Sequence, residues 1–406
     1  MSNPSLPQET LDFIVGFLHD EPEALKACCL SSKLWIPRTR KHLFAKIEFR
    51  SPKDFELWKK TFPDPSTSPA YHTRTMVVHC HSLVLAAAAR AGGLIRTFTR
   101  VARLKLTWTS FHDNSNQRVT AADLEKVSLT PFHGFSSTLK ALHVVFLFLP
   151  YPQIFHLVRS SPLLVHLAFL GVRRPSSEGA DFHGPQTAIP LTLPALTGCL
   201  ELHVSGGMER PIRHLLDLPG GLRFRRLVLS WFEEGDLRWI TELVARCTDT
   251  LQSLHLSCHP PCVFVLVHRW GRSLSLSAGD SGPTSVDLSK VAKLRYAVFL
   301  PQSPAVAWIT AALQTITKHR DLRHVLIHAP HRFTLTQSGT DVRWILGREI
   351  SRQWFDLDRL LVQLSESRSV RLGIVCTPLE MGNQNTRHCI RCLLPETTER
   401  GVIHLV

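Results

Sequence analysis

Cysteine and histidine residues near the C-terminus form the pattern in this chain that comes closest to a metal-binding motif. Cys389 and Cys392 are separated by two residues, and His388 precedes the first of them. A structural zinc site needs four such ligands, usually as two closely spaced pairs. Only Cys376 and His404 are near enough in sequence to complete a set, and they do not form a second pair. We therefore interpret these cysteines as free thiols and predict no metal site.

Two further patterns of the same residue types are weaker. Cys258 and Cys262 are separated by three residues with no second pair, and His79-Cys80-His81 fits the alternation of a β-strand. The sequence contains no phosphate loop of the form G-x-x-x-x-G-K-[ST], no H-E-x-x-H and no G-x-S-x-G. These observations predict a protein with no catalytic residue and no cofactor, which is not an enzyme.

The charge of the chain limits the kinds of partner. Its 406 residues carry a formal net charge of +14, which favours nucleic acid, anionic lipid or acidic protein segments. The charge is spread along the chain without a block of like residues, so we do not expect nucleic acid as a partner. The longest apolar runs, near 142–149 and 263–267, are far shorter than the roughly 18 residues that span a bilayer. With no signal peptide pattern at the N-terminus, we expect a cytoplasmic and/or nuclear protein with reduced thiols and no membrane partner.

Three helix-length patterns occupy the segment 1–50. Leu11, Ile14 and Leu18 have the spacing of one helical face. A second apolar face begins at Leu25, and a third pattern follows from Trp35. Three short helices bury little apolar surface by themselves, so we expect their exposed apolar faces to need a partner.

This segment resembles an F-box. The resemblance covers residues 5–49 and rests on Leu6-Pro7, Glu9, Leu11, Ile14, Leu18, Leu25, Cys29-Leu30-Ser31-Ser32-Lys33, Trp35, Arg40, Leu43-Phe44 and Ile47. The middle of the motif is one residue longer here than in most members of the family. The resemblance implies docking on the Skp-type adaptor of a cullin-RING ubiquitin ligase. It also implies that the residues facing the adaptor are Leu6, Pro7, Ile14, Leu18, Leu25 and Leu30.

A short strand motif recurs through the rest of the chain. It has an apolar residue, two others, an apolar residue, one other and a final apolar residue. The copies are Val101/Leu104/Leu106, Leu139/Leu142/Val144, Leu164/Leu167/Phe169, Thr197/Leu200/Leu202, Phe224/Leu227/Leu229, Leu251/Leu254/Leu256, Val291/Leu294/Tyr296, Leu322/Val325/Ile327 and Ser369/Leu372/Ile374, with a weaker copy at Met76/Val78. Helical patterns lie between several copies, at 236–244 and 307–313. Strands that alternate with helices predict parallel strands with the helices on an outer face.

The body of the chain therefore resembles the irregular leucine-rich solenoid found behind many F-boxes, especially in fungi. We predict an α/β protein in which a three-helix F-box (1–50) precedes a connector with a short helix and a Pro/Ser-rich loop (51–72). An irregular leucine-rich-repeat-like solenoid (73–380) and a C-terminal cap or tail (381–406) follow. The gap between copies varies from 25 residues (Leu142 to Leu167) to 47 (Val325 to Leu372), so an ordinary α/β sheet without a repeat origin remains an alternative. We expect loops at 173–190 and 278–284.

The strand positions that alternate with the buried ones should face a ligand. In these positions the only acidic residue is Glu201, whereas basic residues and histidines are enriched. We predict a substrate-binding concave face formed by Arg103, Lys105, His143, His166, His203, Arg226, His255, Lys293, Arg295, His324 and His328. Arginine pairs bidentately with phosphate and carboxylate, so this face would suit an acidic or phosphorylated segment.

Together these patterns predict a non-enzymatic substrate-recognition adaptor of a cullin-RING ubiquitin ligase. Its partners would be a Skp-type adaptor and an unknown protein substrate. The alternatives are a protein-interaction scaffold without ligase recruitment and a basic nucleic-acid-binding protein.

Overall fold

A computed structural model provides the structure of this protein. It describes residues 7–80, 87–88, 90–107, 129–145, 151–172, 194–204, 207–232, 234–258, 286–300, 306–316, 321–328, 342–367, 370–375, 390–401 and 403–405. The chain divides into two compact units, residues 1–193 and 194–406, which we describe one at a time. The loops expected at 173–190 and 278–284 lie outside the described residues.

Four short helical segments open the first unit. They are α1 (Gln8–Phe17), α2 (Pro22–Ser31), the 3-10 turn η1 (Lys33–Trp35) and α3 (Ile36–Leu43). Pro22 occupies the first turn of α2, where its missing N–H is not needed. Leu11 and Val15, one turn apart on α1, are buried together with Leu25 of α2. Arg38 of α3 forms an ion pair with Asp12 of α1. The predicted helical segment is therefore present, with a small core of its own.

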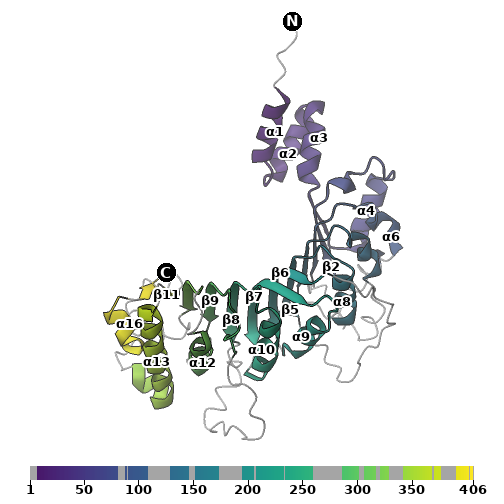
Figure 1. Cartoon of the computed structure of the whole chain (residues 1–406). Helices are drawn as coiled ribbons and strands as arrows, with labels where there is room; N and C mark the ends of the chain where they lie inside the picture. The colour runs from purple at the N-terminus through teal and green to yellow at the C-terminus, as the bar shows by residue number, and fades with distance from the viewer. Residues whose placement is uncertain are drawn as a thin grey trace. The chain divides into compact units, whose positions relative to one another are not determined.

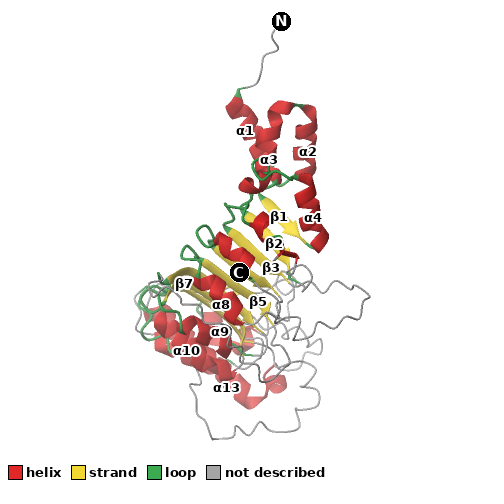
Figure 2. Ribbon diagram, turned by 90° about the vertical axis from the view of Figure 1, so that its right-hand side faces the viewer, coloured by secondary structure: helices red, strands yellow, loops and turns green. Residues whose placement is uncertain are grey.

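Five parallel strands follow in the first unit, each paired with the next in chain order (Figure 2). They are β1 (Lys46–Phe49), β2 (Thr75–His79), β3 (Arg103–Thr107), β4 (Ala141–Val145) and β5 (His166–Val172). The inward residues stand opposite one another in register, and Leu104, Leu142 and Leu167 are all buried. Intervening helical segments are α4 (Pro52–Thr61), η2 (Pro69–His72), α6 (Gly92–Ile95), η3 (Thr130–Phe135) and α8 (Tyr151–Arg159).

The first strand begins inside the segment that resembles an F-box. β1 pairs with β2, so the sheet starts at Lys46. Its alternating Ile47 and Phe49 are buried, as in the later strands. Sequence reasoning missed this strand because four residues are too few for a clear alternation.

Helix α4 packs against this edge of the sheet. Phe49 of β1 stacks on Phe55 of α4 with the ring centroids 4.1 Å apart, and Trp58 lies 5.4 Å from the ring of Phe98. The helix begins with a capping box, in which the backbone N–H of Asp54 bonds to Ser51 and the Asp54 carboxylate accepts from the Ser51 N–H. The segment 51–72 therefore contributes a core helix to the unit, beyond the connecting role that we predicted.

The second unit repeats the same arrangement with seven parallel strands among its described residues, again paired in chain order. They are β6 (Leu196–Val204), β7 (Leu222–Phe232), β8 (Ser253–Cys258), β9 (Tyr296–Leu300), β10 (His324–His328), β11 (Arg371–Val375) and β12 (Ile403–Leu405). The helical segments between them are α9 (Glu209–Leu216), η4 (Glu234–Asp236), α10 (Leu237–Arg246), α12 (Ala307–Ile316), α13 (Val342–Ser367) and α16 (Pro395–Glu399). The helices predicted at 236–244 and 307–313 are thus present as α10 and α12, which lie along one side of β7–β9 (Figure 1).

The strand register differs from the predicted one at β9. The sequence pattern places Leu294 and Tyr296 inward, but Ala297 and Phe299 occupy these positions and are fully buried. Leu294 is also buried, but it lies in the turn before the strand. The apolar residue of a turn was therefore taken for the first inward residue of the strand, and Tyr296 faces outward.

The C-terminal part of the chain adds a strand to the sheet and a short helix that contacts α13. β12 pairs in parallel with β11, so the segment predicted as a cap or tail adds a strand to the sheet. The buried Asp358 of α13 accepts hydrogen bonds from the backbone N–H groups of Glu396 and Thr397 at the start of α16. These contacts fix α16 to α13. In both units, parallel strands alternate with helices in an α/β, leucine-rich-repeat-like fold.

Candidate functional site

Large apolar side chains are exposed on the N-terminal helices. Phe13 and Phe17 of α1 are 66% and 70% exposed, and Leu30 at the end of α2 is 89% exposed. Leu34 in η1 is 62% exposed. Residues i and i+4 share a helix face, so the burial of Leu11 and Val15 turns other faces of α1 towards solvent. Phe13 and Phe17 contact each other edge to face, with centroids 4.5 Å apart.

The structure divides the six residues that the F-box resemblance implies as adaptor-facing. Pro7, Ile14 and Leu30 are exposed, and Leu18 is half-buried. Leu25 is buried in the small helical core, which corrects its assignment to a docking face. Leu6 lies outside the described residues.

Sequence reasoning missed three of the exposed apolar residues, Phe13, Phe17 and Leu34. The Phe13 and Phe17 pair is visible in the sequence as two aromatics four residues apart. Their spacing shows that they share a face, but only the packing of Leu11 and Val15 shows that the aromatic face is the exposed one.

The outward side of the strands in the first unit carries both cations and an acid. Arg103 and Lys105 of β3 are exposed. His143 of β4 and His166 of β5 are half-buried, with ring centroids 4.7 Å apart. These four predicted residues therefore lie on neighbouring strands. Sequence reasoning did not include Glu48 of β1, because the strand itself was missed.

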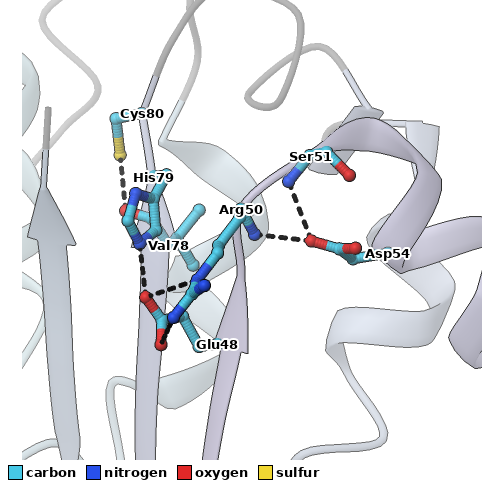
Figure 3. A network of polar contacts seen from close by, with 7 residues as sticks. All are labelled: Glu48, Arg50, Ser51, Asp54, Val78, His79 and Cys80. Carbon is cyan, nitrogen blue, oxygen red and sulfur yellow. Dashed lines mark hydrogen bonds and ion pairs between the residues drawn. The ribbon is translucent and has the colours of Figure 1, made fainter. Parts of the chain in front are cut away.

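Glu48 is the centre of a polar network at this edge (Figure 3). Its carboxylate lies 2.6 Å from Nε2 of the buried His79 and 3.1 Å from the exposed Arg50 side chain. The hydrogen bond from Arg50 lowers the pKa of Glu48 to about 2, against a smaller opposing effect of burial, with a further lowering by His79. The network links β1 to β2 and pairs the Glu48 carboxylate with the Arg50 guanidinium.

The outward side of the second unit is built by β6–β11. His203, Arg226 and His255 lie on β6, β7 and β8, and His324 and His328 lie on β10. The rings of His255 and His328 are stacked with centroids 6.3 Å apart, and Tyr296 stacks on His324 at 4.9 Å.

Lys293 and Arg295, by contrast, lie in the turn before β9 and not on its outward side, which corrects their predicted place. The correction follows from the register of β9, because the strand begins only at Tyr296. Arg295 instead sits at the edge where the strands begin, and its backbone N–H bonds to the carbonyl of Gln252.

Burial changes the electrostatic character of two of these histidines. It lowers the pKa of His255 to about 4, with smaller effects of the same sign from His328 and Arg226. It also lowers the pKa of His203, which Glu201 opposes. Both imidazoles are therefore neutral at pH 7, and the sequence-based count of a basic, histidine-rich surface overstates the positive charge here.

A bulge shapes the end of β7. The pairing with β8 shifts register between Ser230 and Phe232, and Trp231 between them has a φ of 69°. This left-handed conformation is uncommon for a residue with a side chain. It leaves the half-buried Trp231 ring edge-on to His203, with centroids 6.1 Å apart.

Three of the described cysteines have a raised pKa and are therefore poor nucleophiles. Burial raises the pKa of Cys247 and of Cys199 to about 11, and raises that of the fully buried Cys80 further. These thiols stay protonated at neutral pH, whereas a reactive cysteine needs a thiolate. Cys389, the first residue of the C-x-x-C motif, lies outside the described residues.

Among the described residues, no helix combines the length and the apolar character needed to span a bilayer. Comparison with known proteins gives no family assignment, since neither a protein-family model nor a curated protein matches this sequence.

Proposed function

We propose that this protein is a substrate receptor of a cullin-RING ubiquitin ligase, acting in the cytoplasm or nucleus. The N-terminal helices dock on the Skp-type adaptor, and the outward side of the strands binds an acidic or phosphorylated protein segment. The receptor needs no bond chemistry of its own. Holding substrate beside the charged conjugating enzyme makes the transfer effectively intramolecular.

The exposed apolar side chains of the N-terminal helices are the observation that carries this proposal. A helical group whose own core is only a few residues presents Phe13, Phe17, Leu30 and Leu34 to solvent. Apolar side chains gathered on a surface are typical of a docking site for another protein. The resemblance of residues 5–49 to an F-box supplies the kind of partner.

Adaptor binding by the intact chain tests the docking role. We expect wild-type protein to bind the adaptor in a purified two-component assay. Phe17→Asp and Leu30→Asp should each weaken binding at least tenfold, because each replaces an exposed apolar side chain of the docking helices with a charge. Leu57→Asp is the matched control, since Leu57 is 63% exposed but lies on α4, outside the docking helices.

Two results would contradict the proposal: wild-type protein that does not bind the adaptor, or equal binding by wild type and both docking variants. Circular dichroism of each variant separates a lost contact from a lost fold. A protein that folds and binds a segment but not the adaptor would be an interaction scaffold without ligase recruitment.

A further inference from the structure

Arginines lie level with the start of β8 to β11 in the second unit. Backbone hydrogen bonds connect them across the sheet: Gln252 N–H to the Arg225 carbonyl, Arg295 N–H to Gln252, Arg323 N–H to Arg295 and Arg371 N–H to Arg323, at 2.8 to 3.0 Å. We call Arg225, Arg295, Arg323 and Arg371 the arginine row. The row is invisible in the sequence, where its members span residues 225–371.

The side chains of the arginine row are available to a ligand. All four are exposed, and none forms an ion pair or a side-chain hydrogen bond with another described residue. Neighbouring strands are about 4.8 Å apart, so Arg295 and Arg323, which directly precede the paired Tyr296 and His324, lie at roughly that interval. Arg371 stands one residue further along, opposite His324. Arg226, on β7 beside Arg225, adds a fifth exposed cation.

The surface next to the row is neutral. In the middle outward position, β7, β8, β9 and β10 carry Val228, His255, Val298 and Leu326, which stand side by side in register. His255 is an uncharged imidazole at neutral pH, and its Nε2 has no hydrogen-bond partner among the described residues. We call these four residues the neutral strip. Charge and apolar surface are therefore separated into two parallel lines.

The exposed ring of Tyr296 and the half-buried ring of His324 stand between the two lines. Tyr296 is 45% exposed and stacks on His324 in the first outward position of β9 and β10. His324 stands opposite Arg371 in register, so the stack ends beside a member of the row. An aromatic surface of this kind favours a ligand that has apolar or planar groups as well as charge.

We propose that the second unit recognises an amphipathic anionic protein segment that crosses β7–β11. Its carboxylate or phosphate groups pair with the arginine row, and its apolar side chains lie over the neutral strip. The choice of a protein segment rests on the proposed function. The geometry favours it because same-side residues of an extended peptide recur about every 6.8 Å, within reach of flexible arginines spaced at strand intervals.

Fluorescence anisotropy with the full chain tests this proposal. One labelled peptide alternates Glu with Leu, a second has phosphoserine in place of Glu, and a third has Glu with Ser in place of Leu. We expect the first two to bind and the third to bind at least tenfold more weakly. Comparison of the first two shows whether carboxylate suffices or phosphate is required.

Charge reversal locates the binding surface. The triple variant Arg295→Glu, Arg323→Glu, Arg371→Glu should weaken binding of the amphipathic peptides at least tenfold. The control Arg246→Glu, Arg359→Glu changes exposed arginines on α10 and α13 and should change binding less than twofold. Equal losses of peptide affinity in the two variants would show that binding depends only on net charge. That result would overturn the proposal.

A single-stranded oligonucleotide of similar charge is the competing ligand. The choice of a protein segment would be overturned if the oligonucleotide bound more tightly than either amphipathic peptide and the triple variant lost this oligonucleotide binding. Adaptor binding is measured on the same variants. Adaptor binding that fails while peptide binding persists would refute the ligase role and leave the arginine row as a peptide site.

Discussion

Residue environment decides which polar groups on the strands carry charge. Arg226 and His255 occupy outward positions on neighbouring strands, yet the arginine is exposed and charged while the imidazole is half-buried and neutral. A buried neutral group contributes hydrogen bonding and shape, whereas an exposed guanidinium contributes attraction at a distance. The charge of the proposed ligand-binding surface therefore comes from its arginines more than from its histidines.

The Glu48 network should make stability depend on acid. A carboxyl whose pKa is lower in the folded chain stabilises it above the unfolded value of 4.5, and this stabilisation is lost as pH falls towards about 2. We expect the free energy of unfolding of wild-type protein to fall over this window more steeply than that of Glu48→Gln, measured by urea titration at several pH values.

Glu56→Gln is the control for this measurement, because Glu56 is exposed on α4. Its pH dependence should follow that of wild type. Parallel curves for wild type and Glu48→Gln would show that the network does not contribute to acid sensitivity.

At the scale of the element, burial rather than sequence position separates a core leucine from a docking leucine. Leu25 and Leu30 both lie on α2, but one is 1% exposed and the other 89%. Five residues correspond to 500° of helix rotation, or 140° beyond one full turn, which moves the side chain to another face. One helix therefore supplies both a buried core residue and an exposed residue that is available for the proposed docking.

Leu25→Ala should destabilise the first unit by about 2–5 kcal/mol, because it removes buried apolar atoms and leaves a cavity. Leu30→Ala should change the free energy of unfolding by less than about 0.5 kcal/mol, since its side chain is in solvent. Chemical denaturation compares the two variants. A Leu30→Ala variant as unstable as Leu25→Ala would place Leu30 in the core and remove it from the docking face.

At the scale of the whole molecule, the proposed docking residues and the arginine row belong to different units, which predicts two separable activities. The residues proposed to dock lie on α1, α2 and η1, while the arginine row lies level with the start of β8 to β11. No residue belongs to both sets. Mutations at distant sites without shared partners have additive effects on free energy.

We therefore expect Leu30→Asp to leave peptide affinity within twofold of wild type, and the triple arginine variant to leave adaptor affinity within twofold. Titration of each variant with each ligand provides the measurement. Loss of both activities in either variant would indicate that the surfaces are coupled, and the two-surface account would then be wrong.

The local patterns of the sequence determined the kinds of elements and most of the strand register. Alternating leucines predicted β3 to β8, β10 and β11, because a period of two has only one arrangement with the apolar side inward. The same reasoning failed at β9, where a turn residue, Leu294, is as apolar as a strand residue. It also missed β1 and β12, which are too short for a pattern to stand out.

Only the tertiary structure decided which residues act together. Sequence spacing shows that Phe13 and Phe17 share a helix face, but packing of the helices shows that this face is exposed. Spacing cannot show that Arg225 and Arg371 belong to one row, because stacking of successive strands brings distant segments to a common edge. Side-chain charge was likewise settled by burial, which leaves His255 neutral beside exposed arginines. Local sequence patterns thus predict the elements, and composition gives the net charge of +14, whereas packing places that charge on particular surfaces.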